Sequence, residues 1–192
     1  AGKSTGYIVA CQNTAEVGNL KENSNDEESA GGIVAILETA TIENSKNTGN
    51  VIGSTNVGGI AGESKGIITQ CRNDGPISKV TGVICKTVNL GGIVGKNGEA
   101  ARLSNSKNYG NINSETDTLV NLGGICGVLY NNSIVELCEN NGAISGSGKE
   151  IVPNEDTNTN CASCISNNGG SASTDDFGQL NIGIIYGKYQ EI

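Results

Sequence analysis

Histidine, tryptophan and methionine are all missing from this chain, and aromatic residues make up only 3% of it. Without histidine, the chain cannot form the common Ser-His-Asp triads or the HExxH zinc sites of proteases. Aspartate and glutamate do not recur at matching outward strand positions, as paired catalytic carboxylates would. We therefore expect no enzymatic activity and no cofactor or bound metal. We also expect a core built from isoleucine, valine, leucine and alanine.

An excess of positive charge is missing as well. The formal net charge is −8 and the isoelectric point is near 4.5. Proteins that bind nucleic acids or anionic membrane surfaces present basic residues to phosphate groups. No apolar run approaches the roughly 18 residues that signal a membrane span. We therefore expect no nucleic-acid partner and no membrane insertion.

Glycine is abundant, with 29 residues against two prolines. Paired glycines recur at 31–32, 58–59, 91–92 and 123–124, at intervals of 27, 33 and 32 residues. Two of these copies read NLGGIVG (89–95) and NLGGICG (121–127), and a weaker copy, NIGIIYGK, occupies 181–188. Repetition at such a period is typical of solenoid proteins.

A second block of ten residues occurs five times, and its last four copies each follow a glycine pair at a nearly constant distance. Its first residue is aliphatic, its fourth is Cys or Ser, its sixth is Asn, its eighth is Gly or Ala, and its tenth is Val or Ile. The five blocks are IVACQNTAEV (8–17), IENSKNTGNV (42–51), ITQCRNDGPI (68–77), LSNSKNYGNI (103–112) and VELCENNGAI (135–144). These ten positions are called columns one to ten below.

The repeats predict an all-β fold, a parallel β-solenoid (β-helix) of about five to six coils with repeats of 27–33 residues. A single domain is expected overall. Its regular coils would cover 1–147, an irregular or degraded coil or insertion would cover 148–179, and a final strand would lie within 180–192. The segment CISNNGG (164–170) is a candidate degraded copy. Neither end of the pattern shows a cap. Open ends fit a segment of a longer stalk, or a stack continued by another chain.

Alternation within strands predicts which side chains face the core. One inward position per coil is expected to hold Ile33, Ile60, Ile93, Ile125 and Ile185. Two residues later, a small inward residue is expected at Ala35, Gly62, Gly95, Gly127 and Gly187. The positions between them are expected to face outward, namely Val34, Ala61, Val94, Cys126 and Tyr186. Columns one and ten should face inward, with Ile8, Ile42, Ile68, Leu103 and Val135 in the first and Val17, Val51, Ile77, Ile112 and Ile144 in the second.

Column six predicts a structural ladder. Asparagine tolerates left-handed backbone angles, and its side-chain amide can bond the asparagine of the next coil. Glycine two residues later would let the chain turn into the next strand. The ladder would consist of Asn13, Asn47, Asn73, Asn108 and Asn140.

The pattern GGIVG, then aliphatic-x-x-C-x-N-x-G-x-aliphatic, then GGI again, resembles the GLUG repeat family. The resemblance covers 4–147 well and 180–188 loosely. Such repeats occur in large bacterial surface proteins, including adhesins and the non-catalytic region of immunoglobulin A-cleaving metalloproteases. The resemblance implies an extracellular or cell-surface location.

Seven cysteines leave at least one thiol without a partner in the chain. Cys11, Cys71 and Cys138 share column four but lie two coils apart, about 9.6 Å. That distance exceeds the roughly 7 Å Cα limit of a disulfide, so we expect buried thiols. Cys161 and Cys164 form a C-x-x-C pair that could be a redox dithiol, half a zinc site, a local disulfide or simple thiols. The pairing of Cys85, Cys126, Cys161 and Cys164 stays open.

Two further motifs are weak. AGKST at the start lacks the earlier glycine and the strand–loop–helix context of a phosphate-binding loop. DTNTN (156–160) begins like a calcium loop but lacks its later glycine and glutamate. Acidic residues gather in the loops between coils, for example Glu22, Asp26 and Glu27. We interpret them as a solvated edge, with weak calcium binding as the alternative.

Column five contains the candidate binding site. Lys46, Arg72 and Lys107 occupy it in successive coils, between Gln12 and Glu139. Stacked cations about 4.8 Å apart repel one another, and an anionic ligand would relieve this. The stripe therefore predicts binding of an anionic glycan, against the alternative of a solvated edge.

Together these patterns predict a non-catalytic structural or adhesive segment of a secreted or surface-anchored bacterial protein. It would be a rigid spacer, with a possible surface for a glycan or a host surface protein. One alternative is a substrate-recognition region of a larger secreted enzyme. Another is a fibre subunit that associates end to end.

Overall fold

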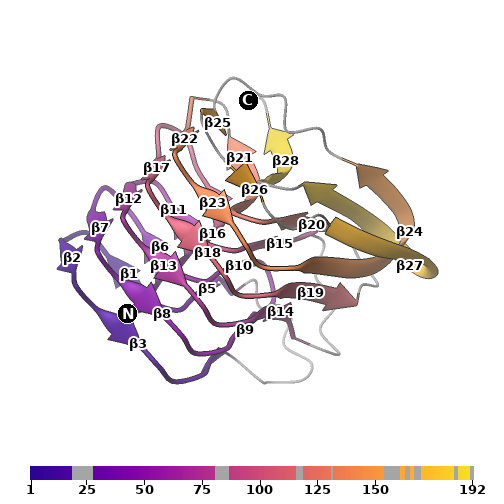
Figure 1. Ribbon diagram of the computed structural model, residues 1–192, viewed down its shortest axis with the longest axis horizontal. Helices are drawn as coiled ribbons and strands as arrows, with labels where there is room; N and C mark the ends of the chain where they lie inside the picture. The colour runs from indigo at the N-terminus through magenta and orange to yellow at the C-terminus, as the bar shows by residue number, and fades with distance from the viewer. Residues whose placement is uncertain are drawn as a thin grey trace.

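The computed structural model is a parallel β-solenoid in which short strands stack into five rows (Figure 1). Side chains are described only up to residue 146. The structure describes the backbone of residues 1–18, 28–80, 87–115, 119–130, 132–153, 161–162, 165–166, 170–183 and 186–190. No helix among these residues is long and apolar enough to cross a membrane.

Each row contains one strand from each successive coil. Row 1 contains β5 (Ala30–Gly31), β10 (Asn56–Gly58), β15 (Thr87–Gly91), β20 (Leu119–Gly123) and the last residues of β27 (Gly170–Gly183). Row 2 contains β1 (Lys3–Ser4), β6 (Val34–Leu37), β11 (Ala61–Ser64), β16 (Val94–Asn97), β21 (Cys126–Tyr130) and β28 (Tyr186–Gln190). Row 3 contains β2 (Ile8–Val9), β7 (Thr41–Glu43), β12 (Ile67–Thr69), β17 (Arg102–Ser104), β22 (Ile134–Glu136) and β25 (Cys161–Ala162).

The remaining two rows complete each coil. Row 4 contains β3 (Gln12–Asn13), β8 (Lys46–Asn47), β13 (Arg72–Asn73), β18 (Lys107–Asn108), β23 (Glu139–Asn140) and β26 (Ile165–Ser166). Row 5 contains β4 (Val17–Gly18), β9 (Val51–Gly53), β14 (Ile77–Lys79), β19 (Ile112–Glu115), β24 (Ile144–Pro153) and the first residues of β27. Because β27 pairs with both β24 and β20, it joins rows 5 and 1 into one sheet.

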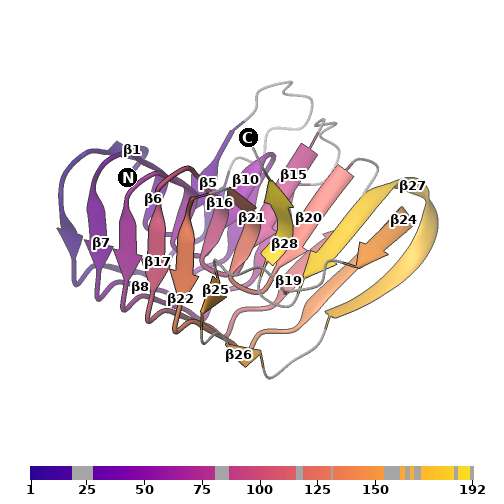
Figure 2. The same ribbon diagram turned by 90° about the horizontal axis from the view of Figure 1, so that it is seen from above.

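The predicted fold class is confirmed, with slightly fewer coils than expected. Within the described residues four coils are complete, namely β5–β9, β10–β14, β15–β19 and β20–β24, so the solenoid has about four turns of about 32 residues. Strands β1–β4 form an incomplete first coil, and β25–β28 follow the fourth complete one. Figure 2 shows the coils side by side along the rod.

Every strand pairing is parallel and links equivalent columns of the repeat. Ile42 pairs with Ile8 on one side and with Ile68 on the other. Ladder positions in successive coils lie 26 to 35 residues apart. Such variation is tolerated because extra residues enter the connections between strands, where they do not change the column order.

Two apolar clusters fill the interior. One lies inside rows 2 and 3 and includes Ile60, Ile93 and Leu103. The other lies between rows 1 and 5 and includes Leu90 and Ile112. In the complete coils, columns one and ten are fully or almost fully buried, as predicted. Ile185 lies outside the described residues.

The predicted outward set is wrong in the described coils. The four described members of this set are fully buried in the apolar cluster inside rows 2 and 3, namely Val34, Ala61, Val94 and Cys126. The chain turns a corner between rows 1 and 2, and alternation holds only within a strand. The corner is visible in the carbonyl of Ile60, which accepts hydrogen bonds from the amides of both Ile33 (3.0 Å) and Val34 (3.1 Å). Consecutive side chains at this corner therefore both reach the core.

The column expected to be small is buried and requires glycine in three coils, at Gly62, Gly95 and Gly127, whereas Ala35 is partly buried. A Cβ built at Gly62 would lie 2.7 Å from the carbonyl oxygen of Ala35 and 2.8 Å from the amide nitrogen of Ala30. A Cβ built at Gly127 would likewise lie 2.8 Å from the amide nitrogen of Leu90. The constraint comes from the backbone of rows 1 and 2 of the preceding coil.

Candidate functional site

Row 4 holds the residues predicted to bind a ligand. Each of its first five strands has two described residues, a column-five residue that points outward and a column-six asparagine that points inward. Each column-five residue pairs with that of the next coil along the outer face, in the order Gln12, Lys46, Arg72, Lys107 and Glu139. The structure therefore brings the three predicted cations into one stripe.

The predicted asparagine ladder is confirmed beneath this stripe. The Nδ2 group of each asparagine donates to Oδ1 of the next, over distances of 2.8, 2.8, 2.9 and 2.8 Å. The same Nδ2 donates to the carbonyl two residues later, for example from Asn73 to Gly75 at 2.8 Å. Oδ1 of Asn73 in turn accepts the Gly75 amide at 3.2 Å. These bonds orient row 4 rigidly.

The left-handed corner lies three residues before the position predicted for it. Positive φ angles between 50° and 54° occur in column three, at Ala10, Asn44, Gln70, Asn105 and Leu137. Glycine in column eight is needed for a different reason. A Cβ at Gly75 or Gly110 would overlap the carbonyl oxygen of the column-eight residue in the preceding coil. Asparagine is therefore needed in column six for the hydrogen bonds of its side-chain amide. It is not needed for a left-handed backbone, because the backbone of this column is extended.

Column four alternates between cysteine and serine. The hydroxyl of Ser106 accepts the amide of Cys71 at 3.1 Å, and the thiol of Cys71 donates to the carbonyl of Thr69 at 3.2 Å. Burial raises the pKa of this thiol to about 11. Cys11, Cys71, Cys126 and Cys138 are thiols. Cys71 and Cys138 are buried as predicted, whereas Cys11 is exposed in the incomplete first coil.

Carboxylates partly neutralise the stripe of cations. Asp74 bridges two coils, at 2.9 Å from Nζ of Lys46 and 2.6 Å from Nε of Arg72. Glu139 lies 2.8 Å from Nζ of Lys107. The repulsion expected between stacked cations is therefore offset within the protein, and three cations share two carboxylates.

These contacts shift the pKa values of the stripe. Burial tends to raise the pKa of Asp74, but its hydrogen bonds with Arg72 and Lys46 outweigh burial and lower it. A hydrogen bond to Asp74 raises the pKa of Arg72. A hydrogen bond to Glu139 raises the pKa of Lys107. Asp74, Arg72 and Lys107 are therefore charged at neutral pH.

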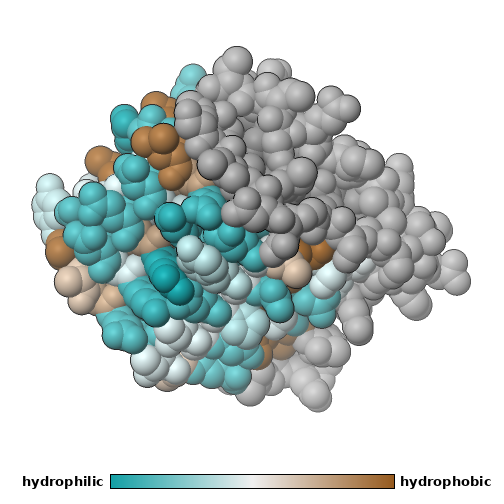
Figure 3. All heavy atoms as spheres, in the orientation of Figure 1, coloured by the Kyte–Doolittle hydropathy of each residue, from teal (hydrophilic) through white to brown (hydrophobic). Residues whose placement is uncertain are grey.

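Column seven contributes two residues that the sequence analysis did not single out. Asp74 is one of them. The other is Tyr109, whose ring centroid lies 4.3 Å from Cζ of Arg72 and whose surface is 39% exposed. Both lie two columns after the cations, so the aligned blocks contained the signal. The space-filling view shows hydrophilic residues over most of the described surface (Figure 3). Among the exposed apolar side chains are Ile67 and Ile134 in row 3 and Leu137 directly after it.

The other sequence motifs can be placed only in part. Lys3 of AGKST lies in strand β1 and forms an ion pair with Glu38 at 2.8 Å, in a strand context unlike a phosphate-binding loop. Within the described residues no group of three acidic, Cys or His side chains is arranged to hold a metal. Several predicted features lie outside the described part of the chain. These are DTNTN, Cys85, Glu22, Asp26, Glu27 and the side chains of the C-x-x-C pair.

Replacing Asp74 by asparagine is expected to reduce stability at pH 7 by about 0.5–1 kcal/mol, because partly exposed ion pairs contribute little. The pKa of Asp74 is lower in the folded chain than in the unfolded one. Its contribution is therefore complete above the unfolded pKa, near 4, and is lost as the pH falls through the folded pKa. Urea unfolding of Asp74→Asn and the parent at pH 7 and pH 2.5 should show the difference shrinking. If the difference in free energy of unfolding between Asp74→Asn and the parent did not change with pH, this role of the Asp74 carboxylate would be contradicted.

Comparison with known proteins identifies the repeat. A family model described as the GLUG motif matches residues 26–52, which include β5 to β8 and most of β9. No curated protein and no solved structure matches the chain significantly. The chain therefore carries a GLUG motif, at residues 26–52, within a parallel β-solenoid.

Proposed function

We propose that this chain is a non-catalytic adhesive spacer of a secreted or surface-anchored bacterial protein, and that row 4 is its binding surface. The observation that carries the proposal is the outward stripe of Lys46, Arg72 and Lys107 on a rigid ladder. The GLUG motif at residues 26–52 supports a location at the cell surface, since GLUG repeats occur in bacterial surface proteins. A substrate-recognition region of a larger secreted enzyme would use the same stripe.

The rigidity of row 4 favours binding. A ligand that meets ordered side chains loses less of its binding energy to their immobilisation. Asp74 and Glu139 hold the three cations in place before any ligand arrives. Parallel stacking also repeats their spacing at about 4.8 Å along the rod.

The chemistry of the stripe suits an anionic glycan. Three cations against two carboxylates leave one positive charge on an otherwise acidic chain. Arg72 can bond a sulfate or carboxylate in bidentate fashion. The exposed ring of Tyr109 offers an apolar face with a polar tip beside it. We expect a sulfated or carboxylated sugar chain to lie along the rod.

The test is binding of the purified chain to a panel of sulfated and carboxylated glycans. Arg72→Ser should weaken binding at least about tenfold, because a charge-assisted contact contributes about 1.5–3 kcal/mol. Arg102→Ser is the matched control. Arg102 is equally exposed at 50% and is also paired with a carboxylate, Glu136, but it lies in row 3. Equal losses in both variants, or no binding by the parent, would reject the stripe as a glycan site.

Association end to end is the second candidate, because successive coils pair in parallel through the same columns, and the same pairing can join the coils of two chains. Electron microscopy across a concentration series, with light scattering, distinguishes the two. Filaments that grow with concentration would indicate a fibre subunit. Discrete short rods would favour the adhesive spacer.

A further inference from the structure

The three cations of row 4 are unequally neutralised. Asp74 lies between the first two, with Oδ2 at 2.9 Å from Nζ of Lys46 and Oδ1 at 2.6 Å from Nε of Arg72. Glu139 lies 2.8 Å from Nζ of Lys107, on the side away from Arg72. Arg72 and Lys107 pair directly in neighbouring strands, yet among the described residues no carboxylate forms an ion pair with both. The place between these two cations is therefore the least neutralised part of the stripe.

The two cations at this place repel each other. A hydrogen bond to Glu139 raises the pKa of Lys107, while the positive charge of Arg72 works against that rise. Strands in neighbouring coils lie about 4.8 Å apart, so one small anion can contact both side chains. Such an anion would replace the repulsion by two attractions. The geometry thus favours a single negative group between the two cations.

Arg72 keeps its terminal nitrogens available. Its Nε donates to Oδ1 of Asp74, and its Cζ lies 4.3 Å from the ring centroid of Tyr109. These two contacts fix the guanidinium in position and in orientation. The four N–H groups on the terminal nitrogens donate to no group among the described residues, and the side chain is 50% exposed. The edge with both terminal nitrogens can therefore bind two oxygens of one ligand.

Lys107 adds donors from the next coil. Its ammonium group has three N–H donors, and Glu139 accepts from one of them. Lys107 is 52% exposed, so the other two donors can reach a ligand. Tyr109 follows two residues later in the same coil and covers Arg72 from that side. The ammonium is therefore expected on the same side of the guanidinium plane as the ring. Arg72, Lys107 and Tyr109 are called the anion subsite below.

We propose that the anion subsite selects a sulfate ester over a carboxylate. The proposal rests on the function proposed above, and it narrows the ligand from an anionic glycan to an O-sulfated one. A sulfate ester has three terminal oxygens around a tetrahedral sulfur. Two of them accept from the terminal nitrogens of Arg72, and the third accepts from Nζ of Lys107. Tyr109 is a positioning residue, because it acts through the guanidinium that it covers.

A carboxylate satisfies only part of the anion subsite. In bidentate contact with Arg72, both of its oxygens lie in the plane of the guanidinium. The third oxygen of a tetrahedral group points out of that plane, toward Lys107. The charge of a sulfate ester also fits, because three cations against two carboxylates leave one positive charge on the stripe. A phosphate ester carries about −1.5 to −2 at pH 7 and would exceed that charge.

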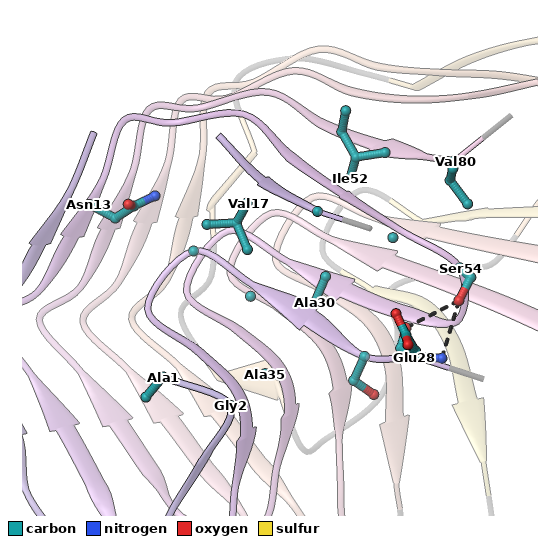
Figure 4. A pocket seen from close by; sticks show the side chains of 15 residues that line it. Ala1, Gly2, Asn13, Val17, Glu28, Ala30, Ala35, Ile52, Ser54 and Val80 are labelled. Atoms are coloured by element: carbon teal, nitrogen blue, oxygen red, sulfur yellow. Dashed lines mark hydrogen bonds between the residues drawn. The ribbon is translucent and has the colours of Figure 1, made fainter. Parts of the chain in front are cut away.

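One cavity of the solenoid, to which Asn13 contributes from row 4, is unsuited to an anion. It has a volume of about 450 Å³, and Val17, Ala30 and Ile52 also lie along its wall (Figure 4). The only charged side chain among its described lining residues is the carboxylate of Glu28, which would repel an anion. An anionic ligand is therefore expected on the outer face of row 4.

The test compares dextran sulfate with carboxymethyl dextran of the same length and degree of substitution. Binding of the whole chain is measured by surface plasmon resonance at neutral pH and about 0.15 M ionic strength, where attraction between distant exposed charges is screened. We expect the dissociation constant for dextran sulfate to be at least about tenfold lower, because one further charge-assisted contact gives that difference. Dextran phosphate should bind no tighter than dextran sulfate. Tighter binding would assign the subsite to a phosphate ester and overturn the proposal.

Lys107→Met removes the charge and the donors of Lys107 while keeping its apolar stem. The preference for dextran sulfate should then fall to about threefold or less. Lys46→Met is the matched control on the same stripe, since Lys46 contacts Asp74 and lies outside the anion subsite. It should weaken the binding of both dextrans to a similar extent and keep the preference. Lys65→Met, directly after β11 in row 2 and 51% exposed, should bind both dextrans as the parent does.

Two substitutions of Tyr109 test its positioning role. Loss of the ring releases the guanidinium of Arg72, so Tyr109→Ala should lower the preference for dextran sulfate about two- to fivefold. Tyr109→Phe keeps the ring and should keep the preference. A loss of affinity in Tyr109→Ala that is equal for both dextrans would show that the ring does not orient Arg72.

The outcomes separate the anion subsite from the function on which it rests. Equal binding of the two dextrans by the parent, or a preference that survives Lys107→Met, would overturn the sulfate subsite and leave glycan binding intact. The absence of binding to either dextran would reject both. A preference that Lys107→Met removes and Lys46→Met keeps would support the subsite.

Discussion

Replacing either Ile93 or Val94 with aspartate is expected to unfold the middle of the solenoid, with a loss of at least about 3 kcal/mol in each case. Both side chains are fully buried in the same apolar cluster. Each substitution removes a packed aliphatic group and leaves a carboxyl group without a partner in the core. In repeat proteins each coil is stabilised mainly by its neighbours, so the damage should extend to the adjoining coils.

The comparison that isolates burial is Ile67→Asp on row 3. Ile67 is 44% exposed, so this variant should unfold within about 0.5 kcal/mol of the parent. Guanidinium and thermal unfolding followed by circular dichroism would measure all three variants. If Val94→Asp were as stable as Ile67→Asp, the outward assignment based on strand alternation would be right after all. The corner between rows 1 and 2 would then be misplaced.

Replacing Asn73 with alanine is expected to cost about 3–5 kcal/mol, the second large effect. Asn73 is fully buried in the ladder. Its amide bonds Asn47, Asn108 and both backbone groups of Gly75. Truncation leaves buried donors and acceptors unsatisfied in three coils, and each such group costs about 1–3 kcal/mol. The full sum is not expected, because several partners keep a second bond.

Asn113→Ala provides the control for the ladder. Asn113 is exposed on row 5, and its Oδ1 accepts one bond from the hydroxyl of Ser145 at 3.0 Å. Its replacement should change the free energy of unfolding by about 0.5 kcal/mol or less. Chemical unfolding with a two-state fit gives both values. A small loss for Asn73→Ala, comparable with the control, would show that water replaces the ladder bonds and that the amides do not stabilise row 4.

The ladder and the stripe could be predicted because parallel stacking preserves columns. Once five blocks are aligned, a residue such as Asn73 must lie above Asn47 and below Asn108, whatever the length of the loops between them. The same rule placed Arg72 between two lysines. These predictions needed only the repeat and the pairing of equivalent strands.

Other features required the path of the chain between strands. Val94 was predicted to face outward because alternation was continued across a corner, where it does not apply. Asp74 reaches Lys46 of the preceding coil from two columns away, and that contact depends on side-chain direction. Row 1 also has an amide ladder, formed by Asn56, Asn89 and Asn121. It could have been recognised, since NLGG contains an asparagine in two copies and Asn56 precedes Val57 in a third.

The sequence by itself determined the β-solenoid, the order of its columns, the ladder asparagines and the position of the cation stripe. Each of these follows from repetition, because stacked copies place identical residues at identical positions. Only the tertiary structure decided where the chain turns its corners and how the cations of row 4 are neutralised. Those features depend on distances between neighbouring rows and coils, which backbone geometry sets and which no column of the repeat encodes.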